Sequence, residues 1–423
     1  MPLAGIAVIR ISGPQSLAIL DRFTDGARRG KPRRAHLRSL VDPADGDVLD
    51  QALVLFFPAP GSVTGEDLVE WHCHGGQAIV RAVLDALQRQ SGQFALREAR
   101  PGEFTRRAFE NGRIDLNEAE GLADLLAAET ETQRRAAMLM ADGHFSRRLE
   151  EWRSRLLICS AQLEALLDFS DEDDVPDDGV EAALRDALSL LRTDMAVQLA
   201  APSAERLKDG IHLVLAGPPN MGKSTLLNAL AGREVAIVSD IAGTTRDRIE
   251  VPVNLGGIAF VLTDTAGLVD ESEDCIERIG IDRARQAMDA ADILLWLGDP
   301  MECPRDDAIR VSARKDRPDW SLPAGVDIAV SAVSGENMDD LLALIRVRAE
   351  RFVPGEGAVA LHRRQRDAVA TMVEALDAAL AEGDLLVMAE HLRMARGAMD
   401  RLIGRAGVED MLDNLFGRFC IGK

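Results

Sequence analysis

A glycine-rich loop between an apolar strand and a helix constrains this chain more than any other feature. Residues 213–227 read L-V-L-A-G-P-P-N-M-G-K-S-T-L-L, which contains the pattern G-x-x-x-x-G-K-S. In such a loop the glycines let backbone N–H groups curve around a phosphate, Lys223 reaches the terminal phosphates, and the Ser224 hydroxyl binds magnesium. Glycine-rich turns are often only turns, but the succession of strand, loop and helix favours a nucleotide-binding α/β domain.

Composition limits what surrounds this loop. The 423 residues suggest about three domains at roughly 150 residues each. The chain is 47% hydrophobic, yet no apolar run reaches the roughly 18 residues that span a membrane, and no basic leader precedes a cleavage site. Five scattered cysteines without a C-x-x-C pair favour a reducing cytoplasm over a disulfide framework or a zinc ribbon. The net charge of -21 argues against unaided nucleic-acid binding, so a partner is expected to carry much of any RNA.

The regions on either side of the loop differ in pattern. Residues 1–108 predict a mixed α/β domain, with strands at 5–11 and 52–57 and a helix at 77–88. Residues 109–207 predict helices, including long runs at 116–141 and 148–167, and an acidic stretch around Pro176 predicts a solvated linker. Helical composition returns at 362–415, so the α/β unit at 208–351 is expected to be inserted into one helical domain formed by 109–207 and 352–423.

The sequence W-H-C-H-G-G offers potential metal ligands in the first region. These ligands are His72, Cys73 and His74. Because no second ligand pair lies nearby, ordinary side chains at the end of a strand are favoured over a metal site.

Further segments follow the loop in the order that a GTPase needs. Residues 240–247 read D-I-A-G-T-T-R-D, in which Thr245 would complete the magnesium shell. A strand at 258–262 leads to D-T-A-G, where Asp264 would lie near magnesium and the Gly267 amide would sense the γ-phosphate. A strand at 326–329 ends at Ser331-Ala332, which is suited to backbone contacts with a base.

The element that reads guanine is altered. A GTPase usually presents N-K-x-D after its fifth strand, whereas residues 313–316 read A-R-K-D. Asp316 is retained and would accept hydrogen bonds from guanine N1 and N2, and Arg314 would stack on the base. Alanine in place of asparagine weakens the prediction of guanine binding without removing it.

Together with T-G-E-D-L-V-E at 64–70, R-P-G-E-F-T-R-R-A-F at 100–109 and C-I-G-K at 420–423, these motifs resemble the bacterial MnmE (TrmE) family of tRNA-modification GTPases over nearly the whole chain. The resemblance implies a multidomain α/β + α fold with a folate-binding, dimerising N-terminal α/β domain, a helical domain from two chain segments and an inserted P-loop GTPase domain, a doubly wound α/β unit. It implies a homodimer in the cytoplasm that joins a flavoprotein, MnmG, in a heterotetramer. This assembly would add an aminomethyl or carboxymethylaminomethyl group to the wobble uridine of certain tRNAs. The tRNA would bind mostly through the partner, which would also hold FAD and NADH. A reduced folate, 5-formyl- or methylene-tetrahydrofolate, would supply the carbon, and no membrane is implied.

The resemblance also implies the residues of each site. The GTP-binding set is Asn220, Met221, Gly222, Lys223, Ser224, Thr225, Ser239, Asp240, Ile241, Ala242, Gly243, Thr244, Thr245, Asp264, Thr265, Ala266, Gly267, Asp316, Ser331, Ala332 and Val333. Magnesium is assigned to Ser224 and Thr245, and potassium to Asn220, Ser239, Ile241 and Thr244. The folate set is Arg10, Glu70, Arg113 and Lys423.

The sequence leaves the origin of catalysis partly open. Leu268 replaces the glutamine that orients water in Ras-like GTPases, and no motif marks an arginine finger. Potassium would offset the developing charge, with Arg246 and Arg248 as the alternative. Glu277 matches the family's water-orienting carboxylate, although a surface glutamate on a helix is an equal alternative.

Other points depart from the family or have two interpretations. The short segment that precedes G-I-A-V-I-R in relatives is missing, which we expect to affect the first strand of the folate domain and part of the dimer contact, and Ser239 replaces the usual threonine. Cys420 suits a packed terminus better than a nucleophile or redox thiol. Two other function classes remain: a ribosome-assembly GTPase, disfavoured by the lack of a basic RNA-binding module, and a nucleotide-gated scaffold without folate chemistry.

Overall fold

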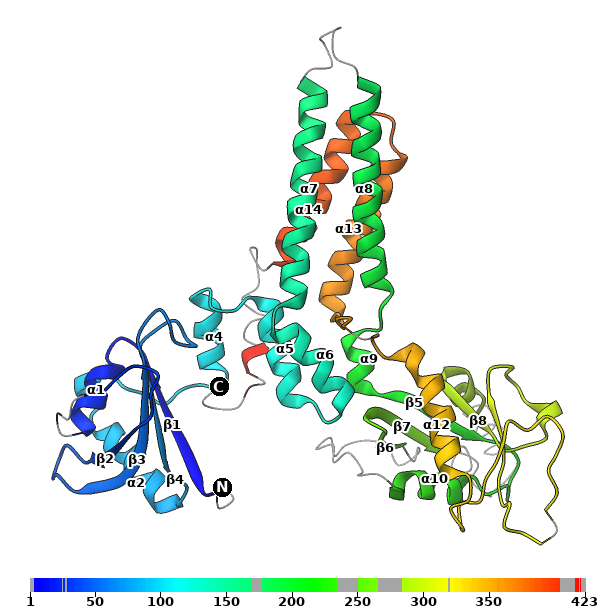
Figure 1. Ribbon diagram of the computed structural model, residues 1–423, viewed down its shortest axis with the longest axis horizontal. Coiled ribbons are helices and arrows are strands. Elements are labelled where there is room, and N and C mark those ends of the chain that lie inside the picture. The colour runs from blue at the N-terminus through cyan, green and yellow to red at the C-terminus, as the bar shows by residue number, and fades with distance from the viewer. Residues whose placement is uncertain are drawn as a thin grey trace, which may run out of the picture. The chain divides into compact units, whose positions relative to one another are not determined.

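The computed structural model describes residues 4–24, 26, 29–168, 177–233, 250–264, 284–318, 320–355, 357–403, 415–417 and 419 (Figure 1). The chain divides into two compact units, one formed by Met1–Ala123 with Ile403–Lys423 and the other by Asp124–Leu402.

The first unit is built on a four-stranded antiparallel sheet with the order β1-β4-β3-β2. Its strands are β1 (Ile6–Ser12), β2 (His36–Val41), β3 (Val48–Phe57) and β4 (Leu68–His74). Its helices are α1 (Ser16–Phe23), α2 (Gln77–Arg89), α3 (Ser91–Phe94) and α4 (Glu103–Glu110). Alternate strand residues such as Ile9, Ile11 and Trp71 pack in one core with Phe23 of α1. The two strands and the helix expected in this region are confirmed, with ends shifted by a few residues.

The metal interpretation of the W-H-C-H sequence is excluded by strand alternation. Cys73 faces the core and is 1% exposed, and burial raises the pKa of its thiol to about 11. His72 and His74 face the other side of β4, where His74 Nδ1 lies 2.7 Å from Asp50 Oδ1. No cluster of three metal-ligating side chains occurs among the described residues.

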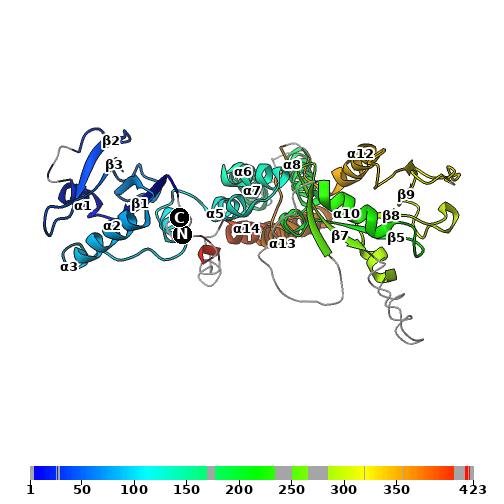
Figure 2. The ribbon, with the colours of Figure 1, turned by 90° about the horizontal axis from the view of Figure 1, so that it is seen from below.

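Four long helices of the second unit pack side by side (Figure 1, Figure 2). They are α7 (His144–Asp168), α8 (Asp177–Ala200), α13 (Arg363–Ala381) and α14 (Leu385–Leu402). Buried residues of α7 recur at helical spacing, as in Leu149, Trp152 and Leu156. Because α7 and α8 precede the second sheet in the chain and α13 and α14 follow it, two separate segments form one helical bundle. No described helix has both the length and the apolar character needed to cross a membrane.

The helical run expected at 116–141 is instead two helices, α5 (Leu116–Ala127) and α6 (Glu131–Ala141). A capping box between them explains the break. Gln133 N donates to Thr130 Oγ1 at 3.3 Å, and Thr130 N donates to Gln133 Oε1 at 3.0 Å. These bonds satisfy donors that a helix start leaves free. The run expected at 148–167 lies within α7 and is confirmed.

The rest of the second unit contains a six-stranded sheet with the order β10-β9-β8-β5-β7-β6. Its strands are β5 (Ile211–Ala216), β6 (Glu250–Leu255), β7 (Ile258–Asp264), β8 (Ile293–Trp296), β9 (Ile309–Ser312) and β10 (Ile328–Ala329). Helices α9 (Ala204–Asp209), α10 (Lys223–Arg233) and α12 (Met338–Ala349) accompany it, with short 3-10 turns η2 (Pro300–Glu302) and η3 (Glu350–Phe352). All its described strand pairs are parallel except β6 with β7.

The predicted fold class, α/β domains combined with a helical domain, is confirmed. In an open parallel sheet, ligands bind at the carboxyl ends of the strands. The G-x-x-x-x-G-K-S loop, which begins at Gly217, follows the carboxyl end of the central strand β5.

Candidate functional site

The loop from Gly217 to Gly222 connects β5 to α10 and has the backbone that a phosphate loop needs. Gly217 has φ of 144° and Gly222 has φ of 94°, both in the region that favours glycine. A Cβ atom at Gly217 would lie 2.9 Å from the carbonyl carbon of Leu297, so a larger residue would force the loop off β8. Asn220 has φ of 61°, a conformation that asparagine tolerates better than most residues.

Lys223 is the buried cation of this loop. Lys223 is only 5% exposed, and its Nζ donates to the carbonyl oxygens of Gly217 at 2.9 Å and Pro218 at 2.8 Å. Burial lowers the pKa of Lys223, and the nearby Asp264 carboxylate opposes that shift. Phosphate oxygens would offer this ammonium stronger, charged acceptors than the two carbonyls do.

Ser224 and Asp264 meet at the carboxyl ends of neighbouring strands. The β5–β7 register pairs Leu215 with Asp264, and Ser224 Oγ donates to Asp264 Oδ2 at 2.5 Å. A hydroxyl and a carboxylate are hard oxygen ligands of the kind that magnesium prefers. These two residues therefore fit a magnesium ion, whereas Thr245 lies outside the described residues.

The A-R-K-D segment at 313–316, which was predicted to read guanine, follows β9, and the segment at 331–333, which was predicted to contact the base, follows its neighbour β10. Ser331 Oγ donates to Asp316 Oδ1 at 2.6 Å, and this hydrogen bond is the largest cause of the lowered pKa of Asp316. Lys315 N donates to the carbonyl of Val330 at 3.1 Å. The structure thus joins Asp316 to Ser331, with the Asp316 carboxylate exposed and ionised at neutral pH.

Ala313 and Arg314 lie against the phosphate loop. A Cβ atom built on Gly222 would be 3.4 Å from Arg314 Nε and 3.6 Å from Ala313 Cβ. Arg314 also has φ of 65°. The sequence predicted stacking of Arg314 on the base but gave no signal for this contact with the phosphate loop, since nothing in the motif fixes the rotamer.

The remaining predicted nucleotide residues divide into placed and undescribed ones. Met221 lies in the loop, Thr225 in α10, and Ala332 and the exposed Val333 follow β10. The following predicted residues lie outside the described part of the chain: Ser239, Asp240, Ile241, Ala242, Gly243, Thr244, Thr245, Thr265, Ala266, Gly267 and Glu277. The same holds for Arg246, Arg248 and Leu268.

The structure brings two predicted folate residues together in the first unit. Arg10 of β1 is the register partner of Glu70 of β4, and Arg10 Nε lies 2.9 Å from Glu70 Oε1. His72 Nε2, which the sequence did not suggest, lies 3.5 Å from Glu70 Oε2. Arg113 follows α4, where its Cγ would be 3.3 Å from a Cβ built on Gly65. Lys423 lies outside the described residues.

Two of the family-specific segments are tied together by Arg107. Its guanidinium lies 2.6 Å from Glu66 Oε2 in T-G-E-D-L-V-E and 2.8 Å from Glu103 Oε1 in R-P-G-E-F-T-R-R. Hydrogen bonds from Arg97 are the largest cause of a Glu103 pKa lowered to about 2. These residues therefore have a structural role that the sequence analysis did not assign.

The C-terminal segment packs in the same unit. A Cβ atom on Gly102 would lie 2.2 Å from the carbonyl oxygen of Phe416, and the rings of Phe416 and Phe109 are 6.4 Å apart. Phe416 and Phe419 are both buried. The aromatic neighbours of Cys420 are thus packed, although Cys420 itself lies outside the described residues.

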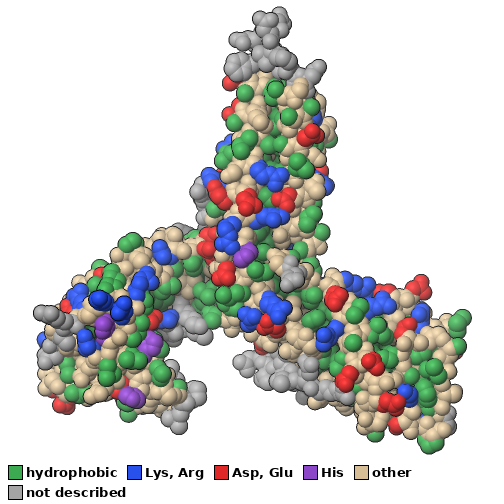
Figure 3. Space-filling model, in the orientation of Figure 1, with side chains coloured by type: hydrophobic (Ala, Val, Ile, Leu, Met, Phe, Trp, Pro, Cys, Tyr) green, Lys and Arg blue, Asp and Glu red, His purple; other side chains and the backbone are tan. Residues whose placement is uncertain are grey.

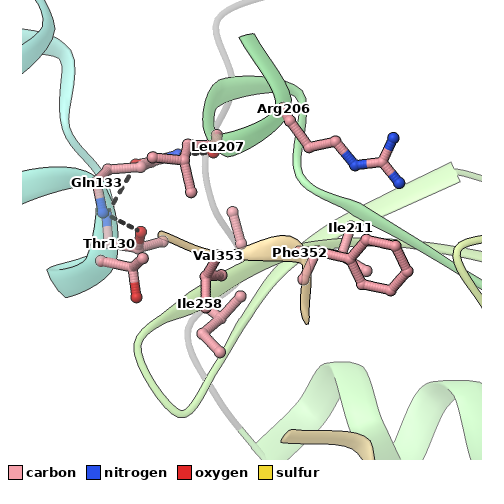
Figure 4. A pocket seen from close by; sticks show the side chains of 10 residues that line it. Thr130, Gln133, Arg206, Leu207, Ile211, Ile258, Phe352 and Val353 are labelled. Atoms are coloured by element: carbon pink, nitrogen blue, oxygen red, sulfur yellow. Dashed lines mark hydrogen bonds between the residues drawn. The ribbon is translucent and has the colours of Figure 1, made fainter. Parts of the chain in front are cut away.

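Where α6, α9 and β7 meet, the second unit is tightly packed (Figure 4). Gln133 Nε2 donates to the carbonyl of Leu207 at 2.8 Å, and the cavity beside it measures only about 10 Å³. A cavity of this size holds one water molecule at most, so it is not a ligand site.

Comparison with known proteins extends over the whole chain. Residues 1–113 match the family model described as the GTP-binding protein TrmE N-terminus, and residues 116–420 match the MnmE helical domain. A "tRNA modification GTPase MnmE" from Rhizorhabdus wittichii is 58% identical over 100% of this chain and 94% of its own length. The protein of the same name from Sphingopyxis alaskensis is 51% identical over 98% of this chain and 100% of its own length. Among solved structures, Aquifex aeolicus Era bound to GDP and aluminium fluoride is 25% identical over 39% of this chain and 66% of that chain, with a TM-score of 0.25.

Proposed function

The chain belongs to the MnmE family of tRNA modification GTPases, and from this premise we propose that it hydrolyses GTP in the course of modifying tRNA. Identity of 58% over the full length of the chain is the observation that carries the proposal. The arrangement of Lys223, Ser224 and Asp264 at the carboxyl end of β5 supports it, because a buried ammonium and two hard oxygen ligands suit a triphosphate with magnesium.

In this proposal, different residues of the chain bind the phosphates, hold magnesium and orient the attacking water. Backbone N–H groups of the loop and the Lys223 ammonium hold the β- and γ-phosphates, and Ser224 with Thr245 would hold magnesium, which neutralises charge on the phosphate oxygens. Gly267 senses the γ-phosphate and Glu277 orients the attacking water. Asp316 selects guanine, with Ser331 holding its carboxylate in place.

The finer proposal concerns the modification itself. The protein acts with the flavoprotein MnmG, which carries FAD and NADH, to add an aminomethyl or carboxymethylaminomethyl group at C5 of a wobble uridine. A reduced folate supplies the carbon and binds at Arg10, Glu70, Arg113 and Lys423. The close Arg10–Glu70 pair supports this site, because the Glu70 carboxylate can accept hydrogen bonds from the pterin amino edge while the Arg10 guanidinium beside it orients that carboxylate.

The proposal also includes a homodimer in the cytoplasm, with domains at 1–108, 109–207 with 352–423, and 208–351. The dimer is supported by exposed apolar side chains on the face of the four-stranded sheet that lies opposite its core. Val8, Leu37 and Leu53 lie on that side in one cross-strand row, with His72 between Leu53 and Val8, and the three apolar residues are 48%, 61% and 45% exposed. An exposed apolar row of this kind is typical of an interface.

Glu70→Ala tests the folate proposal. The change should weaken binding of a reduced folate at least about tenfold, because it removes a charge-assisted acceptor, and should leave GTP hydrolysis near the wild-type rate. Calorimetry with the purified chain measures the first quantity. The exposed Glu110 on α4 provides the matched control, since Glu110→Ala removes a carboxylate whose ion pair, within the described part of the chain, is with Arg106.

The same variant tests the cellular function. A deletion strain should lack the modified wobble uridine in mass spectra of its tRNA nucleosides, wild-type protein should restore it, and Glu70→Ala should not. Full restoration by Glu70→Ala, or equal folate affinity, would remove Glu70 from the proposed site.

The monovalent cation is the second test. With Leu268 in place of a water-orienting glutamine, hydrolysis should be faster in potassium than in sodium by about tenfold or more. Asn220→Ala should erase this difference, because the side-chain oxygen of Asn220 is proposed to hold the ion. Phosphate release measured in the two salts at equal ionic strength gives the answer. Equal rates in both would return Arg246 and Arg248 as the source of positive charge.

A further inference from the structure

Three arginines line an open cleft of about 330 Å³ in the second unit. The cleft lies where the chain leaves α8, enters α9, and later passes from η3 toward α13. Arg206 comes from α9, Arg351 and Phe352 from η3, and Arg366 from α13. Among the described residues, no aspartate or glutamate lines it. We propose that this cleft binds a backbone phosphate of RNA, with tRNA as the source.

The guanidinium groups of Arg206 and Arg351 are held at the cleft by an aromatic ring. They stack on Phe352 with centroid distances of 4.9 Å and 4.7 Å, and Figure 4 shows Arg206 extending beside that ring. Arg206 pairs with Asp292, and Arg351 lies 3.3 Å from Asp307. These two carboxylates lie outside the lining and fix the orientation of both arginines.

Arg366 adds a third guanidinium from another element. Its Nη1 donates to the carbonyl oxygen of Ala201 at 2.7 Å, which holds it against the end of α8. A guanidinium has five N–H groups, so this bond uses one of them. The planar fork that arginine presents matches two oxygens of a phosphate.

The local charge of the cleft, and not the net charge of the chain, favours a phosphate group as the occupant. The chain carries a net charge of -21, and Figure 3 shows basic and acidic side chains interspersed on the visible face of the helical bundle. RNA phosphates would be repelled by most of such a surface. Contact is least opposed at the cleft, where three guanidinium groups and no carboxylate form the lining, although Arg206 and Arg351 each pair with one carboxylate behind it.

The size and chemistry of the cleft favour RNA over an acidic peptide. Its volume is near the lower end of the roughly 300–1,000 Å³ typical of small-ligand sites, which leaves room for a phosphate with its sugar. The two guanidinium groups that cover the Phe352 ring are themselves planar, and bases stack on guanidinium planes of this kind. This inference rests on the proposed function, in which tRNA is the substrate.

Arg351→Gln and Arg366→Gln test the cleft. Binding of unmodified tRNA to the full-length chain is measured by fluorescence anisotropy at several salt concentrations. Each change should weaken binding about tenfold and reduce the slope of log K against log[salt] by about 0.7–0.9, the value for one lost phosphate contact. Arg366→Lys should recover the salt slope but not the full affinity, because lysine keeps the charge and loses the fork.

Arg363→Gln is the matched control. Arg363 begins the same helix, its side chain is 88% exposed, and the ion pair that it makes among the residues the structure describes is with Asp367, at 3.9 Å. It should leave both affinity and slope unchanged. Thermal unfolding of every variant shows whether the fold is retained.

Three results would contradict the proposal that this cleft binds an RNA phosphate. The first is that the wild-type chain shows no measurable tRNA binding. The second is that the Arg351→Gln/Arg366→Gln double variant keeps the wild-type affinity for tRNA and the wild-type salt slope. The third is that this double variant loses binding of polyglutamate while its tRNA binding stays intact. The last result would assign the cleft to an acidic protein partner. The proposed function fails by separate measurements, namely absence of GTP hydrolysis by the wild type or unchanged tRNA nucleosides in the deletion strain.

Discussion

Lys223→Met should slow GTP hydrolysis by a factor on the order of a thousand or more. The Lys223 ammonium is buried beside the phosphate loop, where it donates to the carbonyl oxygens of Gly217 and Pro218. Bound phosphates would turn these contacts into charge-assisted ones that strengthen as charge develops on the bridging oxygen. Methionine keeps the length of the side chain and removes the charge, so the loss measures electrostatics rather than packing.

The thermal stability of the Lys223→Met variant distinguishes a loss of catalysis from a loss of folding. Burial lowers the pKa of Lys223, which means that the folded protein without nucleotide disfavours its charge. Thermal unfolding of the nucleotide-free Lys223→Met variant should therefore occur at the wild-type temperature or above it. Lys208→Met, at an exposed position of α9, is the control and should keep the wild-type rate. Hydrolysis within tenfold of wild type in Lys223→Met would contradict the assigned role of the lysine.

The phosphate loop was predictable because its signals are local. A buried strand, glycines at positive φ and a helix that begins at Lys223 all follow from neighbouring residues. The meeting of Ser224 with Asp264 was predictable for a related reason, since parallel strands bring their carboxyl ends to one edge of the sheet.

Contacts between distant segments could not be predicted in the same way. Arg107 joins Glu66 to Glu103, and Gly102 admits the backbone of Phe416, yet each of these residues alone looks like an ordinary surface or turn residue. The break between α5 and α6 did have a local signal, the T-x-x-Q capping box at Thr130. The helical composition on both sides of Thr130 conceals that signal, because a capping box adds little to the overall apolar periodicity.

The altered guanine element combines both kinds of information. The motif A-R-K-D predicts that Asp316 reads the base, and the fold adds that Ser331 positions its carboxylate and that Arg314 contacts Gly222. The Ser331 hydrogen bond lowers the pKa of Asp316, so its carboxylate stays ionised at every pH above its ordinary pKa of 3.8. Guanine selectivity should accordingly be constant from pH 5 to pH 8.

Asp316→Asn should weaken GTP binding by about a hundredfold or more, because two hydrogen bonds from guanine N1 and N2 lose their charged acceptor. The same variant should bind xanthine nucleotides better than guanine nucleotides, since xanthine presents a carbonyl where guanine presents an amine, and the asparagine amide can donate to it. Competition between fluorescent GDP and unlabelled nucleotides measures both effects. Asp340→Asn, at an exposed position of α12, is the control.

The wild-type protein provides the opposite test. GTP should remain preferred over ATP despite Ala313, because adenine has no donors to offer Asp316 at N1 and C2. The missing asparagine side chain should make guanine binding weaker than in a relative with N-K-x-D, so Ala313→Asn should tighten GDP binding. Ala313 lies 3.6 Å from the Cβ position of Gly222, which leaves the new amide beside the phosphate loop that it would brace. Comparable affinities of the wild type for ATP and GTP would show that another residue, and not Asp316, faces the base.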